Sequence, residues 1–449
     1  MMKLKNILYM MVMLITVSSC KNEQDNLVFG ERPEVRMNEK IDSLNSALVS
    51  AENGWKAILG TGLGGGYSFY MNFDDQQVVN MLADLTTTSL TTVAKSNYRV
   101  KQDNGATLIF DTFNYISLLN DPSSSTFGGI IRDGYKSDIE FGFLYSKGDT
   151  LRFIGKRYRE TLLLIKASSS EKNAYEKGDL KVSRDNTLKF FTDNSNPYID
   201  VTSGTETYKM AVTMNLLSNS VNGKRIEFAS LLPDGTTSAS KGKYAFTLDG
   251  VTIIDGGLAY RGVNYVSLLF ESNKMYLIDG KAGKHEVKNS LQPILPLFKL
   301  VGSKFTSMRS PYKTYYPGTS PKGLTILQRF HNGLAVGTGY SFNSGYMEVA
   351  WDVVNSRLEL RGFSSQNGGN SGWITTIGYN YTLDDVTGTY KCTLRAAASG
   401  GYTAPILDQM NSFLLNNSFR LDYYTANGNL YGSMTSVEDP SIVMILDLQ

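Results

Sequence analysis

The chain has 449 residues, which is two to three times the length of one ordinary domain of about 100–200 residues. Its 44 basic and 42 acidic residues are well mixed and leave a formal net charge of +2, which argues against nucleic acid or an anionic membrane surface as a partner. With 27 Tyr, 21 Phe and 42 Gly, the composition is typical of short strands and tight turns.

The first 19 residues have the features of a secretory signal. Lys3 and Lys5 precede an apolar run over Ile7–Val17, and small residues then lead to Cys20. The run is too short to cross a bilayer as a mature helix, which needs about 20 residues. It looks like a bacterial lipoprotein signal, so we predict that residues 1–19 are removed and that Cys20 is acylated. An ordinary cleaved signal with a chance cysteine is the alternative.

A polar stretch without periodicity, residues 20–37, follows and predicts a flexible tether. A helix is expected next, with Asn38 as its cap and Gly54 as the residue that interrupts it. Its apolar stripe repeats at helical spacing and consists of Ile41, Leu44, Leu48, Ala51 and Trp55. Because this stripe must pack against something, we expect the helix to cover the first of several β modules.

Alternation with a period of two predicts the first module, which with its helix spans residues 38–170. A second, short helix is expected over Asp111–Asn120. The expected strands are Tyr67–Phe73, Val78–Ala83, Thr92–Lys101, Ala106–Phe110, Ile139–Tyr145, Thr150–Ile154 and Leu162–Lys166. Short polar turns such as Asn104-Gly105 join them, and this spacing is typical of a sandwich or barrel.

A Ser-rich, charged run, Ala167–Asp179, predicts a linker to a second module over residues 180–300. Strand patterns resume from Thr187, with hairpin turns at Asn222-Gly223 and Asp249-Gly250. The expected strands are Tyr208–Leu216, Arg225–Phe228, Lys243–Leu248, Val251–Ile254, Val263–Phe270 and Lys274–Ile278.

A stretch rich in Pro, Ser and Gly, Val301–Gly323, predicts a boundary before a third module over residues 323–449. One domain over residues 180–449 is the alternative. The expected strands are Leu324–Phe330, Leu334–Phe342, Tyr346–Val353, Arg357–Arg361, Trp373–Leu383, Thr389–Ala396, Phe419–Tyr424, Leu430–Met434 and Ile442–Leu446, with a helix at Pro405–Leu415. We predict an all-β fold with a few helices, in two or three calycin-like β-barrel or sandwich modules behind the lipoprotein signal.

Two short motifs suggest cofactor or metal chemistry, but their context argues against both. Gly60-Thr61-Gly62-Leu63-Gly64-Gly65 fits a dinucleotide-binding pattern that needs a strand before it and a helix after it, whereas we expect a helix before and a strand after. His285-Glu286 begins like the helix of a zinc protease, but Asn289 occupies the position of the second histidine. With His331 as the other histidine of two, we predict no metal and no cofactor.

The sequence also gives no catalytic residue. No nucleophile elbow surrounds a serine, and a Ser-His-Asp triad would have to use one of the two histidines. Cys392 shares a predicted strand face with Tyr390 and Leu394, so we expect a buried structural cysteine. Hydrolysis by paired carboxylates needs no motif, and the adjacent pairs Asp74/Asp75 and Asp384/Asp385 are better turn residues than acid/base partners.

One stretch combines polar and aromatic residues in a way that suits ligand binding. The Gly/Asn/Ser loop Ser364–Gly372, which contains Asn367 and Asn370, runs into a strand with aromatic residues on one face. Those aromatic residues are Trp373, Tyr379 and Tyr381. Sugar rings stack on such platforms while loop groups bind hydroxyls, so this is a candidate ligand site. The alternative is that the aromatic face is simply the core of the module.

Several segments resemble an outer-membrane lipoprotein family of the Bacteroidota, domain of unknown function family 4302. They are Gly54–Lys56, Gly65–Phe73, Ser96–Val100, Leu108–Asn114, Asp138–Phe141 and Gly155–Arg157. Relatives are typically encoded beside SusC-like transporters and SusD-like binding lipoproteins, which implies a role in nutrient capture or import. In similar lipoproteins, acidic residues such as Glu23 and Asp25 just after the cysteine favour display on the outer face of the outer membrane.

We therefore expect a lipid-anchored, non-catalytic accessory or binding protein of an outer-membrane uptake system for glycan or peptide. Its expected partners are the membrane, through the lipid, and a SusC/SusD-like complex, with no nucleic acid. It is expected to face the cell exterior, with the periplasmic face as the alternative. A carboxylate-dependent hydrolase of glycan or peptide and a surface scaffold without ligand are the other two hypotheses.

Overall fold

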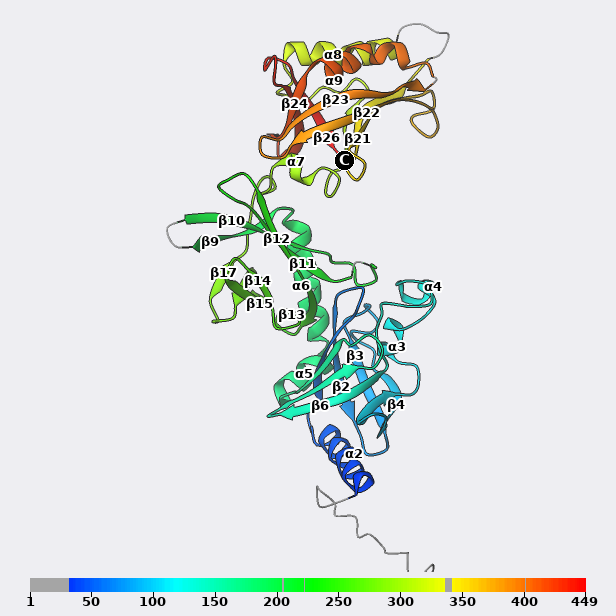
Figure 1. The fold of residues 1–449 in the computed structure, drawn as a ribbon, viewed down its shortest axis with the longest axis vertical. Helices are drawn as coiled ribbons and strands as arrows, with labels where there is room; N and C mark the ends of the chain where they lie inside the picture. The colour runs from blue at the N-terminus through cyan, green and yellow to red at the C-terminus, as the bar shows by residue number, and fades with distance from the viewer. Residues whose placement is uncertain (1–31, 204–205, 222, 336–340, 400) are drawn as a thin grey trace, which may run out of the picture.

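The computed structural model describes residues 32–203, 206–221, 223–335, 341–399 and 401–449, so the predicted signal and Cys20 lie outside the described residues. Three β bodies lie in a row along the long axis of the molecule (Figure 1). Two are closed barrels of eight strands, β1–β8 and β19–β26, and a ten-stranded sheet lies between them. The predicted all-β architecture with barrel modules is confirmed.

The first barrel is an antiparallel meander that closes where Trp55 of β1 pairs with Lys166 of β8. Its strands are β1 Trp55–Gly60, β2 Gly66–Phe73, β3 Val78–Ala83, β4 Ala94–Gln102, β5 Ala106–Phe110, β6 Glu140–Lys147, β7 Thr150–Gly155 and β8 Thr161–Lys166. The short helices α3 Tyr115–Leu119 and α4 Ser124–Phe127 lie between β5 and β6. Successive strand residues alternate between the barrel core and its outer surface, as the period of two predicts.

The N-terminal helix, α2, spans Pro33–Val49 and therefore begins before the predicted cap Asn38. Proline suits the first turn because its fixed φ is helical and its missing N–H would have no partner there. The predicted tether, residues 20–37, thus extends too far into the chain. Trp55 is not in the helix but starts β1, and its indole Nε1 donates to the Leu48 carbonyl at 2.8 Å.

The predicted linker Ala167–Asp179 is wrong, because two helices occupy it: α5 Ser169–Lys177 and α6 Asp179–Asp193. Ser168 caps α5, and Glu171 bonds back to the backbone of Ser168 in a capping box. The serine and the charged residue that suggested a linker therefore mark the start of a helix. Gly178, with φ of 87°, separates the two helices in a left-handed conformation that favours glycine. The strand pattern expected from Thr187 begins only after α6.

The middle sheet has the order β17-β16-β15-β13-β12-β11-β10-β9-β18, with β14 beside β15. Its strands are β9 Pro197–Ser203, β10 Glu206–Met214, β11 Arg225–Leu231, β12 Thr237–Thr247, β13 Gly250–Ile253, β14 Leu258–Tyr260, β15 Val263–Glu271, β16 Lys274–Asp279, β17 Lys284–Glu286 and β18 Lys288–Asn289. The consecutive strands β17 and β18 lie at opposite ends of this order, so the sheet curls until its two edges meet at one segment.

The connection from β10 to β11 runs from Met214 to Arg225 and is too long for the tight hairpin turn predicted at Asn222-Gly223. Asn222 itself lies outside the described residues. Buried residues of the middle sheet form one cluster with Tyr70, Leu82 and Leu90 from the outside of the first barrel. The outer face of the first barrel therefore packs against the core of the middle sheet, while the barrel interior forms a separate cluster.

The last barrel follows a connector that contains α7 Leu297–Leu300. Its strands are β19 Ser307–Pro311, β20 Ser344–Asp352, β21 Arg357–Ser365, β22 Trp373–Asp384, β23 Thr389–Ser399, β24 Ser418–Ala426, β25 Asn429–Ser436 and β26 Val443–Leu448. The 3₁₀ helix η1 Ala404–Leu407 and α9 Asp408–Asn416 lie where one helix was predicted. The buried cluster of this barrel contains residues from Leu297 onward.

The strand predicted at Leu324–Phe330 is wrong, because α8 spans Pro321–Ala335. Of the strand predicted at Leu334–Phe342, the first two residues belong to α8, and residues 336–340 lie outside the described residues. Ser320 accepts a hydrogen bond from the Gly323 N–H at 3.1 Å, and Pro321 begins the first turn. Leu327, Phe330 and Leu334 are buried at helical spacing. A short apolar run of this kind fits strand or helix equally well by periodicity. Among the described residues, no helix has the length and apolarity to cross a membrane.

Candidate functional site

The structure separates the aromatic residues that were predicted to form one binding face. Trp373 is 52% exposed at the start of β22, with its ring 6.3 Å from that of Phe342. Tyr379 is fully buried, and its hydroxyl donates to Oδ1 of Asn411 at 2.6 Å. Tyr381 is half-buried against Tyr390 in the barrel core. The core interpretation therefore holds for Tyr379, while Trp373 keeps an accessible ring.

The loop before Trp373 is held together by its own hydrogen bonds. Oδ1 of Asn367 accepts from the Ser371 N–H at 3.0 Å and from the Ser365 hydroxyl at 2.8 Å, and Nδ2 of Asn367 donates to the Ser371 hydroxyl at 2.8 Å. The Asn370 amide donates to the carbonyl of Asn367 at 3.0 Å. Both predicted ligand-binding amides thus shape the loop itself.

The two histidines have structural partners. His331 is fully buried on α8, its Nε2 lies 3.2 Å from the Ser310 hydroxyl, and burial lowers its pKa to about 4. His285 lies on the strand β17, not on a helix, with Nε2 3.0 Å from Oδ2 of Asp279. A buried serine–histidine pair is out of reach of a substrate. Across the described ranges, no group of three or more His, Cys, Asp or Glu side chains is placed to hold a metal ion.

Cys392 is buried as predicted, and burial raises the pKa of its thiol to about 12. A thiol with this pKa stays protonated at neutral pH and is a poor nucleophile. Leu394, predicted to share its face, is 52% exposed, because β23 runs past the barrel core beyond Cys392.

The glycine-rich segment after β1 makes the contact between the first barrel and the middle sheet. It connects the strands β1 and β2, so the helix expected before it is absent, and the dinucleotide pattern fails because strands lie on both sides. A Cβ atom on Gly65 would lie 2.3 Å from the backbone N of Lys224, and one on Gly223 would lie 2.1 Å from the backbone N of Gly65. Glycine is required here because the two backbones touch.

A buried ion pair lies beside this contact. Nζ of Lys224 is 2.5 Å from Oδ2 of Asp84, and both side chains are fully buried. Nζ also lies 4.4 Å from the ring centroid of Tyr67 and 5.1 Å from that of Phe246. Asp84 further accepts the backbone N–H groups of Ser68 and Phe246. Burial lowers the pKa of Lys224 to about 8, against the attraction of Asp84.

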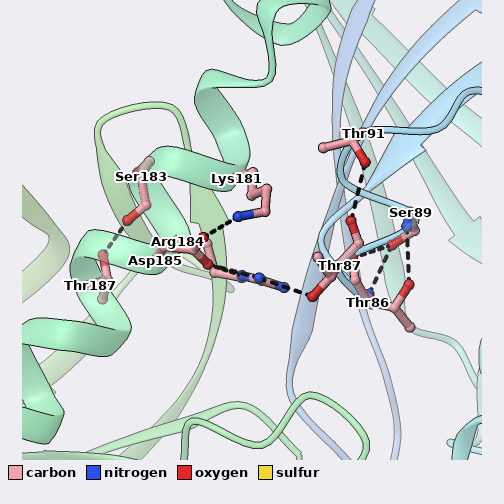
Figure 2. Close-up of polar contacts among 9 residues, drawn as sticks. All are labelled: Thr86, Thr87, Ser89, Thr91, Lys181, Ser183, Arg184, Asp185 and Thr187. Atoms are coloured by element: carbon pink, nitrogen blue, oxygen red, sulfur yellow. Dashed lines mark hydrogen bonds and ion pairs between the residues drawn. The ribbon is translucent and has the colours of Figure 1, made fainter.

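Helix α5 crosses the outer face of the first barrel near this ion pair. Tyr175 stacks on Tyr70 of β2 with centroids 4.7 Å apart, and Glu171 pairs with Lys56 of β1 at 2.5 Å. The next helix, α6, adds a polar contact to the loop after β3, where Arg184 donates to the Thr87 hydroxyl at 3.4 Å (Figure 2). These contacts fix both helices on the barrel.

A cavity of about 440 Å³ lies beside α5, and we call it the polar pocket. Its main lining residues are Tyr70, Asn72, Asn80, Leu82, Thr91 and Glu176. Burial, and secondly the nearby Glu176 carboxylate, raise the pKa of Tyr70 to about 12, so its hydroxyl remains a donor, to the Asn53 carbonyl. This volume lies within the range of small-molecule sites, about 300–1,000 Å³.

Two adjoining cavities of about 330 and 510 Å³ lie at the junction of β1 and β8 with β13 and β15. Tyr175 of α5 lines both the first of them and the polar pocket. They share Ile58, Ile165 and Thr252, and we call them the aliphatic groove. The barrel interior, in contrast, is filled by large side chains such as Phe69, Phe141 and Phe153. These three cavities therefore lie outside the first barrel.

Sequence reasoning missed the polar pocket. Tyr70 and Asn72 lie in the predicted strand Tyr67–Phe73, at positions that a period of two puts on its outer face, a face that normally meets solvent. An aromatic residue among the polar positions was the available signal that another element covers this face.

The fold is thus that of a β-rich protein in which the core of a curled sheet packs against the outer face of one of two closed barrels. A family model described as a domain of unknown function (DUF4302) matches residues 25–272, more than half of the chain, and the chain belongs to that family. The match covers the first barrel and the middle sheet as far as β15, including the polar pocket, and ends before the last barrel. A search of curated proteins found no match.

Proposed function

We propose that this protein is a lipid-anchored, non-catalytic binding protein of an outer-membrane uptake system for glycan or peptide. Acylated Cys20 anchors it, with the body facing the cell exterior. The polar pocket carries the proposal, because it combines convergent polar side chains with an aromatic wall between the first barrel and α5. The pocket also lies within the family-matched part of the chain.

The tether supports a role beside other membrane proteins. We propose that the predicted tether between Cys20 and α2 is flexible, and a flexible chain of about 12 residues spans roughly 20 Å. The body is therefore held close to the membrane, which raises its effective concentration near other anchored proteins. We propose that its partner there is a SusC/SusD-like transporter complex, to which it delivers ligand.

Trp373 is a second candidate ligand site, on the last barrel. Its half-exposed ring lies beside a loop fixed by internal hydrogen bonds, so a ligand would meet a rigid aromatic surface. Asn367 and Asn370 act there by holding the loop. Loss of ligand binding in a Trp373→Ala variant would place the ligand at this site and not in the polar pocket, because the two sites lie on different barrels.

The proposal is tested in cells that carry the full-length chain. Cys20→Ala should stop incorporation of labelled fatty acid and move the protein out of the membrane fraction. Mild crosslinking should recover the unmodified protein with a transporter complex, and deletion should reduce uptake while hydrolysis of the same nutrient in extracts continues.

Three outcomes contradict the proposal. Labelled fatty acid on the Cys20→Ala variant contradicts the anchor. A purified protein that cleaves glycan or peptide, and stops when one acidic residue is neutralised, identifies a carboxylate-dependent hydrolase. Normal uptake after deletion, with neither partner nor ligand found, leaves a surface scaffold.

A further inference from the structure

Two amide side chains form the floor of the polar pocket. Asn72 of β2 and Asn80 of β3 are directly opposite partners in the antiparallel ladder, so their Cβ atoms are about 5 Å apart on the same face. Both are half-buried and line the pocket. Among the described residues, neither amide has a hydrogen-bond partner. Each can donate two hydrogen bonds and accept two, so the pair offers matched donors and acceptors to one ligand.

The charged groups of the pocket indicate a neutral ligand. Glu176 and Lys177 both line it, so their formal charges cancel. Thr91 adds a hydroxyl at the rim, while Leu82 and the Tyr70–Tyr175 pair supply an apolar wall. A ligand with many hydroxyl groups and apolar C–H faces matches both kinds of surface.

The strand pairing argues against a peptide in this pocket. An extended peptide gains most of its affinity by pairing with a free sheet edge. Here β2 is paired on both sides, with β1 and β3, and β3 is paired with β2 and β4 in a closed barrel. The ligand must therefore be held by side chains, as a saccharide is.

The acidic groups argue for binding without cleavage. Glycoside hydrolysis by carboxylates needs two of them, about 5–10 Å apart across the bond. Glu176 is the one carboxylate among the described residues that line this pocket.

We propose that the polar pocket binds a neutral saccharide, with Asn72 and Asn80 bonding adjacent hydroxyls and Glu176 accepting a further one. This inference rests on the proposed binding function and narrows its ligand from glycan or peptide to glycan. The aliphatic groove on the far side of Tyr175 lies outside this proposal.

The test measures binding of neutral disaccharides and of uncharged capped tripeptides to the purified full-length protein by calorimetry. We expect a disaccharide to bind and the double variant Asn72→Ala/Asn80→Ala to bind at least tenfold more weakly, because several hydrogen bonds are lost together. Asn97→Ala is the matched control, since Asn97 is an exposed amide on the neighbouring strand β4, and it should bind normally.

A second variant keeps the test decisive if the double variant is unstable. Val93 is 57% exposed at the pocket, so Val93→Trp should block the pocket without disturbing the core, and binding should be lost. Saccharide binding that survives both variants, or binding of peptides alone, overturns this inference and leaves the proposed binding function standing. Binding of neither class contradicts both.

Discussion

The first and last barrels have the same antiparallel order of eight strands but very different surroundings. The outer face of the first barrel is covered by α5, α6 and the middle sheet, and a buried ion pair links Asp84 to Lys224. The last barrel instead packs Leu297 of the connector into its own buried cluster, and the Tyr423 hydroxyl donates to the Leu295 carbonyl at 3.0 Å. An eight-stranded barrel can therefore bury its outer face against the core of a neighbouring sheet, as the first one does, or pack as a separate unit, as the last one does.

Substitution of Lys224 should produce the largest difference in stability between the two barrels. Lys224→Met leaves the Asp84 carboxylate buried without its cation, which should lower the free energy of unfolding of the first barrel and middle sheet by about 3–5 kcal/mol. Segment-resolved hydrogen exchange of the full-length protein measures both barrels at once. Protection should fall in β1–β8 and remain in β19–β26.

The double variant Lys224→Met/Asp84→Asn should recover part of the lost free energy of unfolding, because it no longer buries an unpaired charge. A loss of less than about 1 kcal/mol in the single variant, or an equal loss of protection in both barrels, would show that the ion pair does not join the first two bodies into one unit.

A pH change should instead act on the last barrel through His331. Its pKa is lowered to about 4 in the folded protein, so between about pH 6.5 and 4 the unfolded chain binds a proton that the folded chain does not. The free energy of unfolding should therefore fall by up to about 3 kcal/mol as pH drops through this window.

Urea denaturation followed by tryptophan fluorescence measures this effect. In a Trp55→Phe background the remaining tryptophans, Trp351 and Trp373, both lie in the last barrel. His331→Gln should flatten the pH dependence between pH 6.5 and 4. An unchanged slope in that variant would mean that other groups cause the acid sensitivity.

The smallest effects distinguish the inside of the last barrel from its surface. Tyr379→Phe should cost about 1 kcal/mol, because Asn411 loses its hydrogen-bond donor. Trp373→Ala should lower the free energy of unfolding by less than Tyr379→Phe does, because the Trp373 ring is already half exposed. Thermal unfolding of both variants checks the order, and a loss of several kcal/mol for Trp373→Ala would show that its ring is part of the core.

Local patterns predicted most strands well, because alternation of apolar and polar residues is set within one strand. β3 and β5 have the bounds that were predicted, and the predicted Asn104-Gly105 turn joins the paired strands β4 and β5 with φ of 53° and 122°. Patterns failed where one sequence fits two structures. The apolar run at Leu324–Phe330 was predicted as a strand but lies in α8. The Ser-rich run at Ala167–Asp179 was predicted as a linker but contains α5, although Ser168 and Glu171 have the spacing of a helix-capping pair.

The site was less predictable than the fold, because its parts come from distant segments. The sequence alone determined that Asn72 lies on the outer face of a strand and that Gly65 has no side chain. Whether that face meets solvent or forms a pocket was decided by α5, which begins near residue 169 and packs over β2 and β3. Likewise Lys224 finds Asp84 across 140 residues of chain. Tertiary packing decided these features, because burial and partner choice depend on which elements meet, and no local pattern records that.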